Sequence, residues 1–325
     1  MISDTILGSS AQWPDLEALL DRARQNRCYI DALNPESSLT NAWFKQTDGR
    51  RQQDWLNAVS WAAKDAAVFR LRKMVADVAP DPKAKPLAKV SLREAIDLAD
   101  RTSALWLENG RNDRRFILSM MPPEQRATFL DWEKRRIISF ESRGGLGELR
   151  VSLQELAERS LLDPRTNRAL FDSDGEVPGH RSRDAEAMIA FCESVHLAYH
   201  CLVRRAIENY LPRKALWSWT THDLRKRSER SKKIEAFDRM SVDQRHHFRM
   251  KAGWDKVPSA HVASLYQGIS EIDHATLREG IDDNIASVYD TFMDEIYGWA
   301  TKEEIDPGVQ ATIKDIADWI RVPYA

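Results

Sequence analysis

The sequence is poor in cysteine, which argues against the covalent and metal frameworks that small secreted domains use. Its 325 residues include only three cysteines, Cys28, Cys192 and Cys201. None of them lies in a Cys-x-x-Cys pair, so neither a disulfide framework nor a cysteine-bound zinc site is indicated. We therefore expect reduced thiols, as in a cytoplasmic protein.

Long apolar segments are also missing. No run of eighteen apolar residues occurs, and the first twenty residues lack the basic start and apolar centre of a signal peptide. The sequence thus predicts a cytoplasmic protein that does not have a membrane as a partner.

Several motifs of common enzymes are absent. The sequence contains no Walker loop, Gly-x-Gly-x-x-Gly, Gly-x-Ser-x-Gly or His-Glu-x-x-His. ATP-driven, dinucleotide-dependent, serine-hydrolase and zincin activities therefore lack motif support. The hydrophobic fraction of 42% and the charged fraction of 30% are those of a globular chain, which argues against wholesale disorder.

Glycine and proline are few and clustered, and apolar residues recur mostly at three- and four-residue spacing. This pattern, without clear strand alternation, predicts an all-α fold: a multi-helix bundle with one large or two packed helical domains. The predicted helices include residues 52–79, 91–110 and 191–211, and a last helix that holds Val309, Ile313, Ile316 and Ile320.

Two loops are candidate domain boundaries. The first contains the glycine cluster SRGGLGELR, and the second is the turn-rich stretch at residues 163–184. We expect an N-terminal helical region at residues 1–142 and a C-terminal helical bundle at residues 150–325.

Charge is unevenly distributed within the C-terminal part. Residues 204–233 carry ten Lys or Arg against three acidic residues, whereas residues 271–306 carry eleven Asp or Glu against two basic residues. Such polarity suits binding to a polyanion, or pairing between two parts of one protein or between two protomers. The sequence leaves these alternatives open.

Two Glu-x-x-His sequences raise the question of a metal site. Helical bundles hold dimetal carboxylate sites with a Glu-x-x-His on each of two helices and a further glutamate on each of two others. Here Glu193 with His196, and Glu271 with His274, would be ligands of iron or manganese. Glu155, Glu158 and Glu208 are candidates for the remaining ligands. On the predicted helix 191–211, His200 continues the face of Glu193 and His196. The alternatives are histidines that are hydrogen-bonded at a seam between helices, and catalysis without metal.

The basic segment, residues 204–233, interleaves its cations with aromatic residues. Cations neutralise phosphates and aromatic faces stack on bases, which are the two requirements for binding single strands. The candidate nucleic-acid-binding residues are Arg204, Arg205, Arg213, Lys214, Trp217, Trp219, Arg225, Lys226 and Arg227. The partner would be RNA, DNA or an acidic protein. The alternative is a solvated basic helix whose tryptophans belong to the core.

Residues 187–246 resemble the HEPN superfamily of small helical bundles, many of which cut RNA. The similarity lies in the His-Asp-Leu turn at residues 222–224 and in an Arg that is followed by a His, Arg239 and His246. The resemblance implies metal-independent ribonuclease activity, with Arg239 at the scissile phosphate and His246 as acid or base. It also implies that a homodimer forms the cleft. A polyanion-binding interaction protein is our first interpretation; the ribonuclease and the metalloenzyme are alternatives, and enzyme activity stays open.

Overall fold

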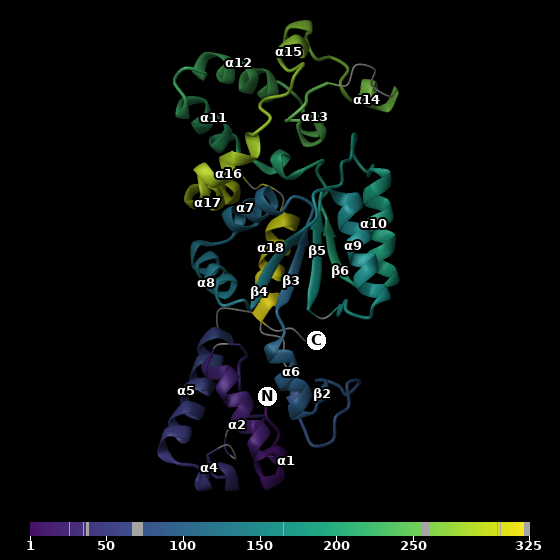
Figure 1. Cartoon of the computed structure of the whole chain (residues 1–325). Coiled ribbons are helices and arrows are strands. Elements are labelled where there is room, and N and C mark those ends of the chain that lie inside the picture. Colours follow the sequence, from purple (N-terminus) through teal and green to yellow (C-terminus); the bar gives the residue numbers. More distant parts are fainter. Residues whose placement is uncertain are drawn as a thin grey trace. The chain divides into compact units, whose positions relative to one another are not determined.

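The computed structural model describes residues 1–25, 27–34, 36, 39–66, 74–164, 166–254, 260–303, 305 and 307–321 (Figure 1). The chain forms two compact units. Unit 1 contains Met1–Ser103, Trp132–Ser139 and Asp315–Ala325, and unit 2 contains Ala104–Asp131 and Phe140–Lys314. The glycine-rich loop that we considered as a domain boundary lies within unit 2.

The predicted all-α fold is wrong, because the protein is 57% helical and also contains two parallel sheets, which makes it a mixed α/β fold. The strands escaped the sequence analysis for a physical reason. Buried strands of a parallel sheet are continuously apolar and do not alternate, so a short apolar run cannot be distinguished from part of a buried helix. The five residues SALWL are such a run, and they form strand β3 (Ser103–Leu107).

Unit 1 is mainly helical, with a two-stranded parallel sheet of β1 and β2. Its core gathers Leu16, Leu20, Trp43 and Trp55, all of which are fully buried. Its elements are α1 (Asp4–Leu7), η1 (Ser10–Gln12), α2 (Trp13–Arg24), α4 (Ala42–Gln46), α5 (Gly49–Ala66), β1 (Val75–Ala76), β2 (Lys89–Val90) and α6 (Leu92–Asp100).

Unit 2 contains most of a four-stranded sheet with the order β4-β3-β5-β6. Its strands after β3 are β4 (Ile138–Ser142), β5 (Asn167–Phe171) and β6 (Ala198–Cys201). The helices are α7 (Gly110–Met120), α8 (Pro123–Lys134), α9 (Leu146–Glu158), α10 (Arg183–Ser194), η2 (Ile207–Tyr210), α11 (Arg213–His222), α12 (Arg227–Asp238), α13 (Val242–His247), α14 (Ala260–Leu265), α15 (Glu271–Thr276), η3 (Ile285–Ser287), α16 (Val288–Thr291), α17 (Met293–Lys302) and α18 (Pro307–Arg321), the last of which continues into unit 1, as β4 and α8 also do in part.

Three strands run parallel and end at the same edge of the sheet. Leu107 at the end of β3 lies opposite Leu170 of β5, and Phe171 lies opposite Cys201 at the end of β6. The residues that follow these strands therefore come together at one edge. Figure 1 shows helices α11 to α15 beyond this edge, which is where open α/β sheets bind their ligands.

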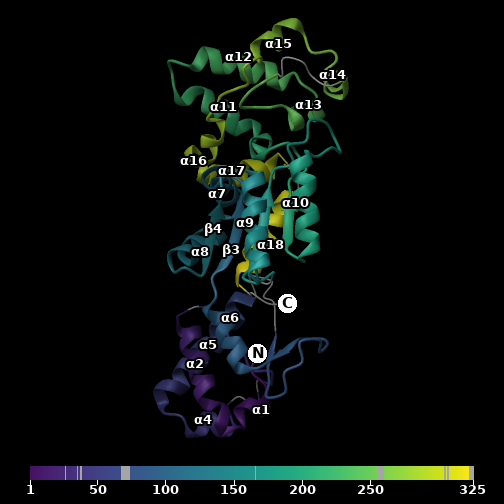
Figure 2. The same cartoon turned by 45° about the vertical axis from the view of Figure 1, so that its right-hand side comes forward.

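The packing of α9 and α10 fixes this edge in place. A core of Trp106, Leu149, Leu153, Phe171 and Met188 joins the two helices to the sheet. In Figures 1 and 2, α9 and α10 lie together along β5 and β6, and α7 lies toward the other side of the strands. The edge is thus supported by buried apolar contacts, and it can carry polar side chains at fixed positions.

The structure corrects the three predicted helices. The helix expected at residues 52–79 does not reach its predicted end, because Val75–Ala76 is a strand. Helix α5 is described over Gly49–Ala66, and Phe69 of the apolar stripe lies outside the described residues. Ser91 caps α6 as predicted, accepting a hydrogen bond from the Glu94 backbone N–H at 3.1 Å. That helix stops at Asp100, and Gly110 begins α7 instead of ending a helix.

The helix that we predicted at residues 191–211 is also wrong. Helix α10 ends at Ser194, and β6 occupies Ala198–Cys201. His196 adopts a left-handed backbone conformation with φ of 56°, which terminates the helix. The last predicted helix is confirmed as α18.

None of the helices in the described ranges is both long enough and apolar enough to span a bilayer.

Candidate functional site

Acidic side chains gather where the central parallel strands end. Glu108 directly follows β3 and Asp172 directly follows β5. The Asn109 backbone N–H donates to Asp113 Oδ2 at 2.7 Å, which turns this carboxylate inward at the start of α7, where only 3% of the residue is exposed. The turns after β3 and β5 thus bring three carboxylates to one edge of the sheet.

A fourth carboxylate comes from the turn after β6. The Ile207 backbone N–H donates to Asp172 Oδ1 at 3.1 Å, which ties the short helix η2 to the end of β5. Glu208, the next residue, is only 2% exposed. Its carboxylate forms an ion pair with Lys251, whose Nζ lies 2.6 Å from Oε1. We call Glu108, Asp113, Asp172 and Glu208 the carboxylate site.

Three carboxyl groups of this site have raised pKa values, first because they are buried and then because acids lie near them. Burial, together with the charge of Asp174, raises the pKa of Glu108 to about 7. Burial, with Glu108 and Glu208 nearby, raises the pKa of Asp113 to about 7. Burial and the same set of acids raise the pKa of Asp172 well above its usual range. Such shifts arise when like charges share a poorly solvated place.

Among the residues that the structure describes, Lys251 is the basic residue in ion-pair contact with this site. Burial alone would lower the pKa of its ammonium group, but the carboxylate of Glu208 raises the pKa above its ordinary value. One cation does not balance four carboxylates. Glu108 Oε2 is also shielded from solvent and has no hydrogen-bond partner. A buried carboxylate oxygen in this state carries an unmet need for a donor or a cation.

Backbone hydrogen bonds join the three loops around the site. The Asp174 N–H donates to the Arg205 carbonyl at 2.9 Å, and the Arg205 N–H donates to the His246 carbonyl at 3.0 Å. His247 Nδ1 lies 2.9 Å from the Gly175 carbonyl. A Cβ atom on Gly175 would lie 2.3 Å from the His180 carbonyl oxygen, so this close turn requires glycine.

Side chains that bind the same metal ion must lie closer together than side chains that only affect one another's pKa. Within the ranges that the structure describes, no group of three or more His, Cys, Asp or Glu side chains could hold a metal ion. The members of the carboxylate site therefore interact through their charges, but they are not close enough together to bind one metal ion as they lie. A cation that binds here would have to draw them together.

The residues of the predicted dimetal site lie on different elements. Glu193, near the end of α10, accepts a hydrogen bond from the Tyr199 hydroxyl at 3.0 Å. His196 is in the turn that follows, and His200 is in β6, with Nδ1 3.1 Å from Thr312 Oγ1. Glu193, His196 and His200 do not share a helical face, because His200 lies in the extended strand β6.

The second predicted pair belongs to α15. Glu271 is exposed in the first turn of this helix. The ring of His274 stacks on Trp254, with centroids 5.0 Å apart and planes inclined by 5°. This histidine therefore contributes to an aromatic cluster.

The residues that suggested a ribonuclease are engaged in other contacts. Arg239 forms a two-pronged ion pair with Asp273, with Nε 3.0 and 3.1 Å from the carboxylate oxygens. Burial, and then the nearby Arg204, lower the pKa of His246 to about 4, so this imidazole is neutral at physiological pH. Strand β6 lies inside the segment that resembles HEPN proteins, so the helical bundle implied by that resemblance is wrong. The activity itself is still a prediction.

The candidate nucleic-acid-binding residues lie in four different surroundings. Arg204 and Arg205 are partly buried, and the guanidinium of Arg204 lies 4.6 Å from the ring centroid of Tyr210. Arg213 and Trp217 both contact Asp238, at 2.8 and 2.9 Å. Trp219 is a core residue, only 4% exposed.

The remaining candidate cations, Lys214, Arg225, Lys226 and Arg227, are exposed. Lys214 is exposed, but its backbone N–H donates to Glu303. Arg225, Lys226 and Arg227 are consecutive exposed residues at the start of α12, whose first residue is Arg227, beside Leu224, which is 76% exposed. We call these three cations the basic turn.

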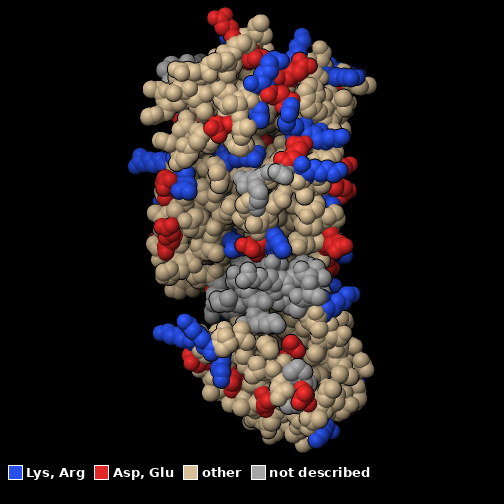
Figure 3. All heavy atoms as spheres, turned by 180° about the vertical axis from the view of Figure 1, so that it is seen from behind, with Lys and Arg blue, Asp and Glu red and all other residues tan. Residues whose placement is uncertain are grey.

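Part of the predicted charge polarity is satisfied inside the protein. Lys233 of the basic segment donates to the Ile281 carbonyl at 3.1 Å, and Arg230 Nη2 lies 3.9 Å from Asp282 Oδ2. On the face shown in Figure 3, basic and acidic side chains lie next to one another. The alternative in which the two segments pair within one protein is thus supported at these contacts.

The sequence analysis missed three of the four members of the carboxylate site, and it considered Glu208 only as a possible metal ligand on a helix. The available signal was an acid placed directly after a short apolar run, in SALWLE and RALFD. Comparisons with family models, curated proteins and solved structures found no match to this chain.

Proposed function

We propose that this protein is a divalent-cation-dependent phosphodiesterase that acts on nucleic acid. The observation that carries the proposal is the carboxylate site, in which Glu108, Asp113 and Asp172 from the ends of β3 and β5 lie beside Glu208, and burial together with neighbouring acids raises the pKa of these three groups. Mg²⁺ and Mn²⁺ prefer carboxylate oxygens and would remove this repulsion. Glu108, Asp113, Asp172 and Glu208 would hold such a cation once drawn together, and the cation would supply polarisation of a phosphoryl oxygen and activation of a water molecule.

The basic turn supports nucleic acid as the polyanion. Arg225, Lys226 and Arg227 are exposed and consecutive, and each of them can neutralise a phosphate. The deciding assay incubates a labelled single-stranded oligonucleotide, of RNA and of DNA, with the protein in Mg²⁺, Mn²⁺ or EDTA. We expect cleavage that requires the cation. RNA cleavage that persists in EDTA and disappears in His246→Ala would point to the ribonuclease instead.

Without a divalent cation, the stability of the folded protein should fall as the pH rises. The folded state keeps protons on Glu108 and Asp113 up to about pH 7, whereas unfolded carboxyls release theirs near their ordinary pKa. Because the folded state then binds more protons, its free energy of unfolding decreases across this window. Saturating Mn²⁺ should reverse the loss at pH 8 by mass action. Thermal unfolding in EDTA and in Mn²⁺ measures both effects.

A matched pair of substitutions tests this assignment. Glu108→Gln should flatten the pH dependence, while Glu148→Gln, at an exposed position of α9, should leave it unchanged. The charges of Lys251, Asp174 and Glu208 also act on Glu108. The dependence of stability on pH is therefore compared between variants. Equal profiles in Glu108→Gln and the wild type would contradict the assignment.

Removing the basic turn should weaken nucleic-acid binding and its dependence on salt. Each phosphate contact on a single strand contributes about 0.7 to the slope of log affinity against log salt. The triple substitution of Arg225, Lys226 and Arg227 by alanine should therefore reduce the slope by about 2. Fluorescence anisotropy in EDTA, at several salt concentrations, measures it. Arg159→Ala, at an exposed position after α9, is the control, and an unchanged slope in the triple variant would remove this surface from the proposal.

A further inference from the structure

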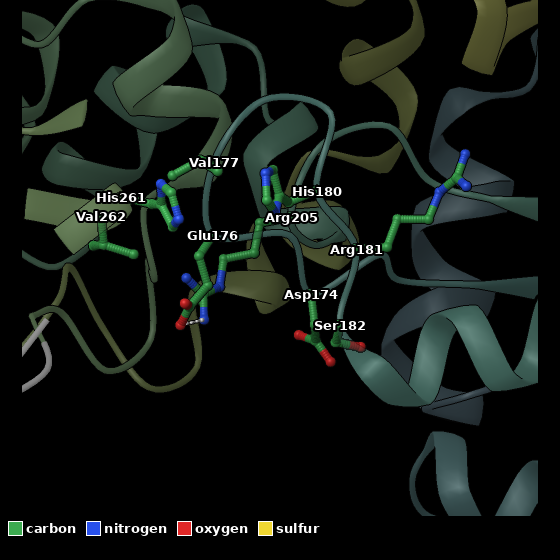
Figure 4. A pocket seen from close by; sticks show the side chains of 9 residues that line it. All are labelled: Asp174, Glu176, Val177, His180, Arg181, Ser182, Arg205, His261 and Val262. Atoms are coloured by element: carbon green, nitrogen blue, oxygen red, sulfur yellow. Dashed lines mark ion pairs between the residues drawn. The ribbon is translucent and has the colours of Figure 1, made fainter. Parts of the chain in front are cut away.

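Two cavities of unit 2 meet at one arginine. The first has a volume of about 420 Å³ and lies between the loop after β5 and helix α14 (Figure 4). The second has a volume of about 290 Å³ and lies beside the aromatic residues that follow α13. Arg205 and Val262 line both cavities. Together the two chambers have the size of a site for a small organic ligand.

Arg205 is a poorly solvated cation with weak partners. Its side chain is only 14% exposed, and Glu176 Oε1 lies 3.9 Å from Nη2, near the limit of an ion pair. Its other partner is the His247 carbonyl oxygen, 3.4 Å from Nη1. An arginine that is desolvated in this way gains most from a bidentate anion such as a phosphate.

The first chamber adds two histidines, whose ring N–H groups can donate to an anion, and it also contains the carboxylates of Asp174 and Glu176. His180 and His261 lie with their ring centroids 5.8 Å apart, and both line the cavity with Arg205. Figure 4 shows Arg205 directed toward Glu176 in this chamber, and Arg181 extending away from it. Asp174 also lines the chamber, and its charge acts on Glu108 and Asp172. The chamber is therefore next to the carboxylate site.

The second chamber is aromatic. The ring centroid of Trp254 lies 4.6 Å from that of Tyr266 and 4.9 Å from that of Phe248, and all three residues line the cavity. Aromatic walls favour a planar ring, which stacks on or packs edge-on against them. Because Arg205 lines both chambers, a phosphate in the first chamber and a ring against the aromatic residues of the second would be two ends of one ligand.

We propose that the two chambers bind one nucleotide unit, with its phosphate at Arg205 and its base against Trp254 and Tyr266. The inference rests on the proposed function, because it names the unit of substrate that is held beside the carboxylate site. The site recognises a ring and a phosphate together, so neither part alone should bind as well as the whole.

Isothermal titration in EDTA with three probes tests this site. We expect AMP to bind at least about tenfold more tightly than ribose 5-phosphate, which lacks the base, and than adenosine, which lacks the phosphate. Arg205→Gln should weaken AMP binding by about tenfold and leave adenosine unaffected. Trp254→Leu should abolish the preference for AMP over ribose 5-phosphate. Equal binding of AMP and ribose 5-phosphate by the wild type would overturn the inference.

Two further variants separate the possible failures. Trp61→Leu is the matched control for Trp254→Leu, since Trp61 is 44% exposed and does not line either chamber. His261→Ala, at an exposed position, tests the phosphate chamber if Arg205→Gln does not fold. AMP binding without cation-dependent cleavage would reject the proposed function and keep this site. Cleavage without a preference for AMP would reject this site alone.

Discussion

Asp172→Asn should greatly slow cation-dependent cleavage while leaving the fold intact. The carboxylate of Asp172 lies at the end of β5, and its Oδ1 accepts the Ile207 backbone N–H. An asparagine side chain has the same shape and can accept this hydrogen bond through its own oxygen, but it carries no charge for a cation. We expect the rate of oligonucleotide cleavage in Mn²⁺ to fall by roughly a hundred- to a thousandfold.

The same substitution should stabilise the metal-free protein. The pKa of Asp172 is raised, so at pH 8 its ionised form is unfavourable in the folded state, and asparagine removes that penalty. The melting temperature in EDTA at pH 8 should therefore increase. Asp184→Asn, at an exposed position in the first turn of α10, should change neither quantity. Full cleavage by Asp172→Asn would exclude the carboxylate site as the catalytic centre, whatever happens to stability.

Local signals in the sequence were read correctly where the interaction is local. The Ser91 cap and helix α18 follow from capping residues and from helical spacing, because both depend on neighbours within a few positions. Strand pairing depends on partners far along the chain. Leu107 pairs with Leu170, and nothing near either residue distinguishes its apolar run from a helix.

The carboxylate site was hidden for the same reason. Glu108 and Asp172 are far apart in the sequence, and only the parallel sheet brings the ends of β3 and β5 together. Glu208 joins them because the Ile207 backbone N–H donates to Asp172. Conversely, Glu193 and His200 satisfied a helical spacing that the chain does not adopt. A spacing rule identifies a site only if the secondary structure beneath it is right.

Gly253→Ala should destabilise unit 2 severely. Gly253 has a φ of 71°, and a Cβ atom there would lie 2.2 Å from the Arg278 carbonyl oxygen and 2.4 Å from the Gly280 nitrogen. These are backbone atoms that cannot rotate away. The Trp254 N–H donates to the Arg278 carbonyl at 3.2 Å, and the Ile281 N–H donates to the Met250 carbonyl at 2.7 Å, so the two turns are fastened to each other.

Gly268→Ala measures the cost of the left-handed backbone conformation without the cost of a steric clash. Gly268 has a φ of 87°, but a Cβ atom there would have no neighbour within 4 Å, so alanine should cost only about 1 kcal/mol of unfolding free energy. For Gly253→Ala we expect a loss of about 3 kcal/mol or more, since steric overlap adds to the strained φ. Urea denaturation of both variants measures the difference, and equal losses would show that the turns can separate without cost. Because Lys251 lies in the first turn, this variant should also weaken its ion pair with Glu208 and so disturb the carboxylate site.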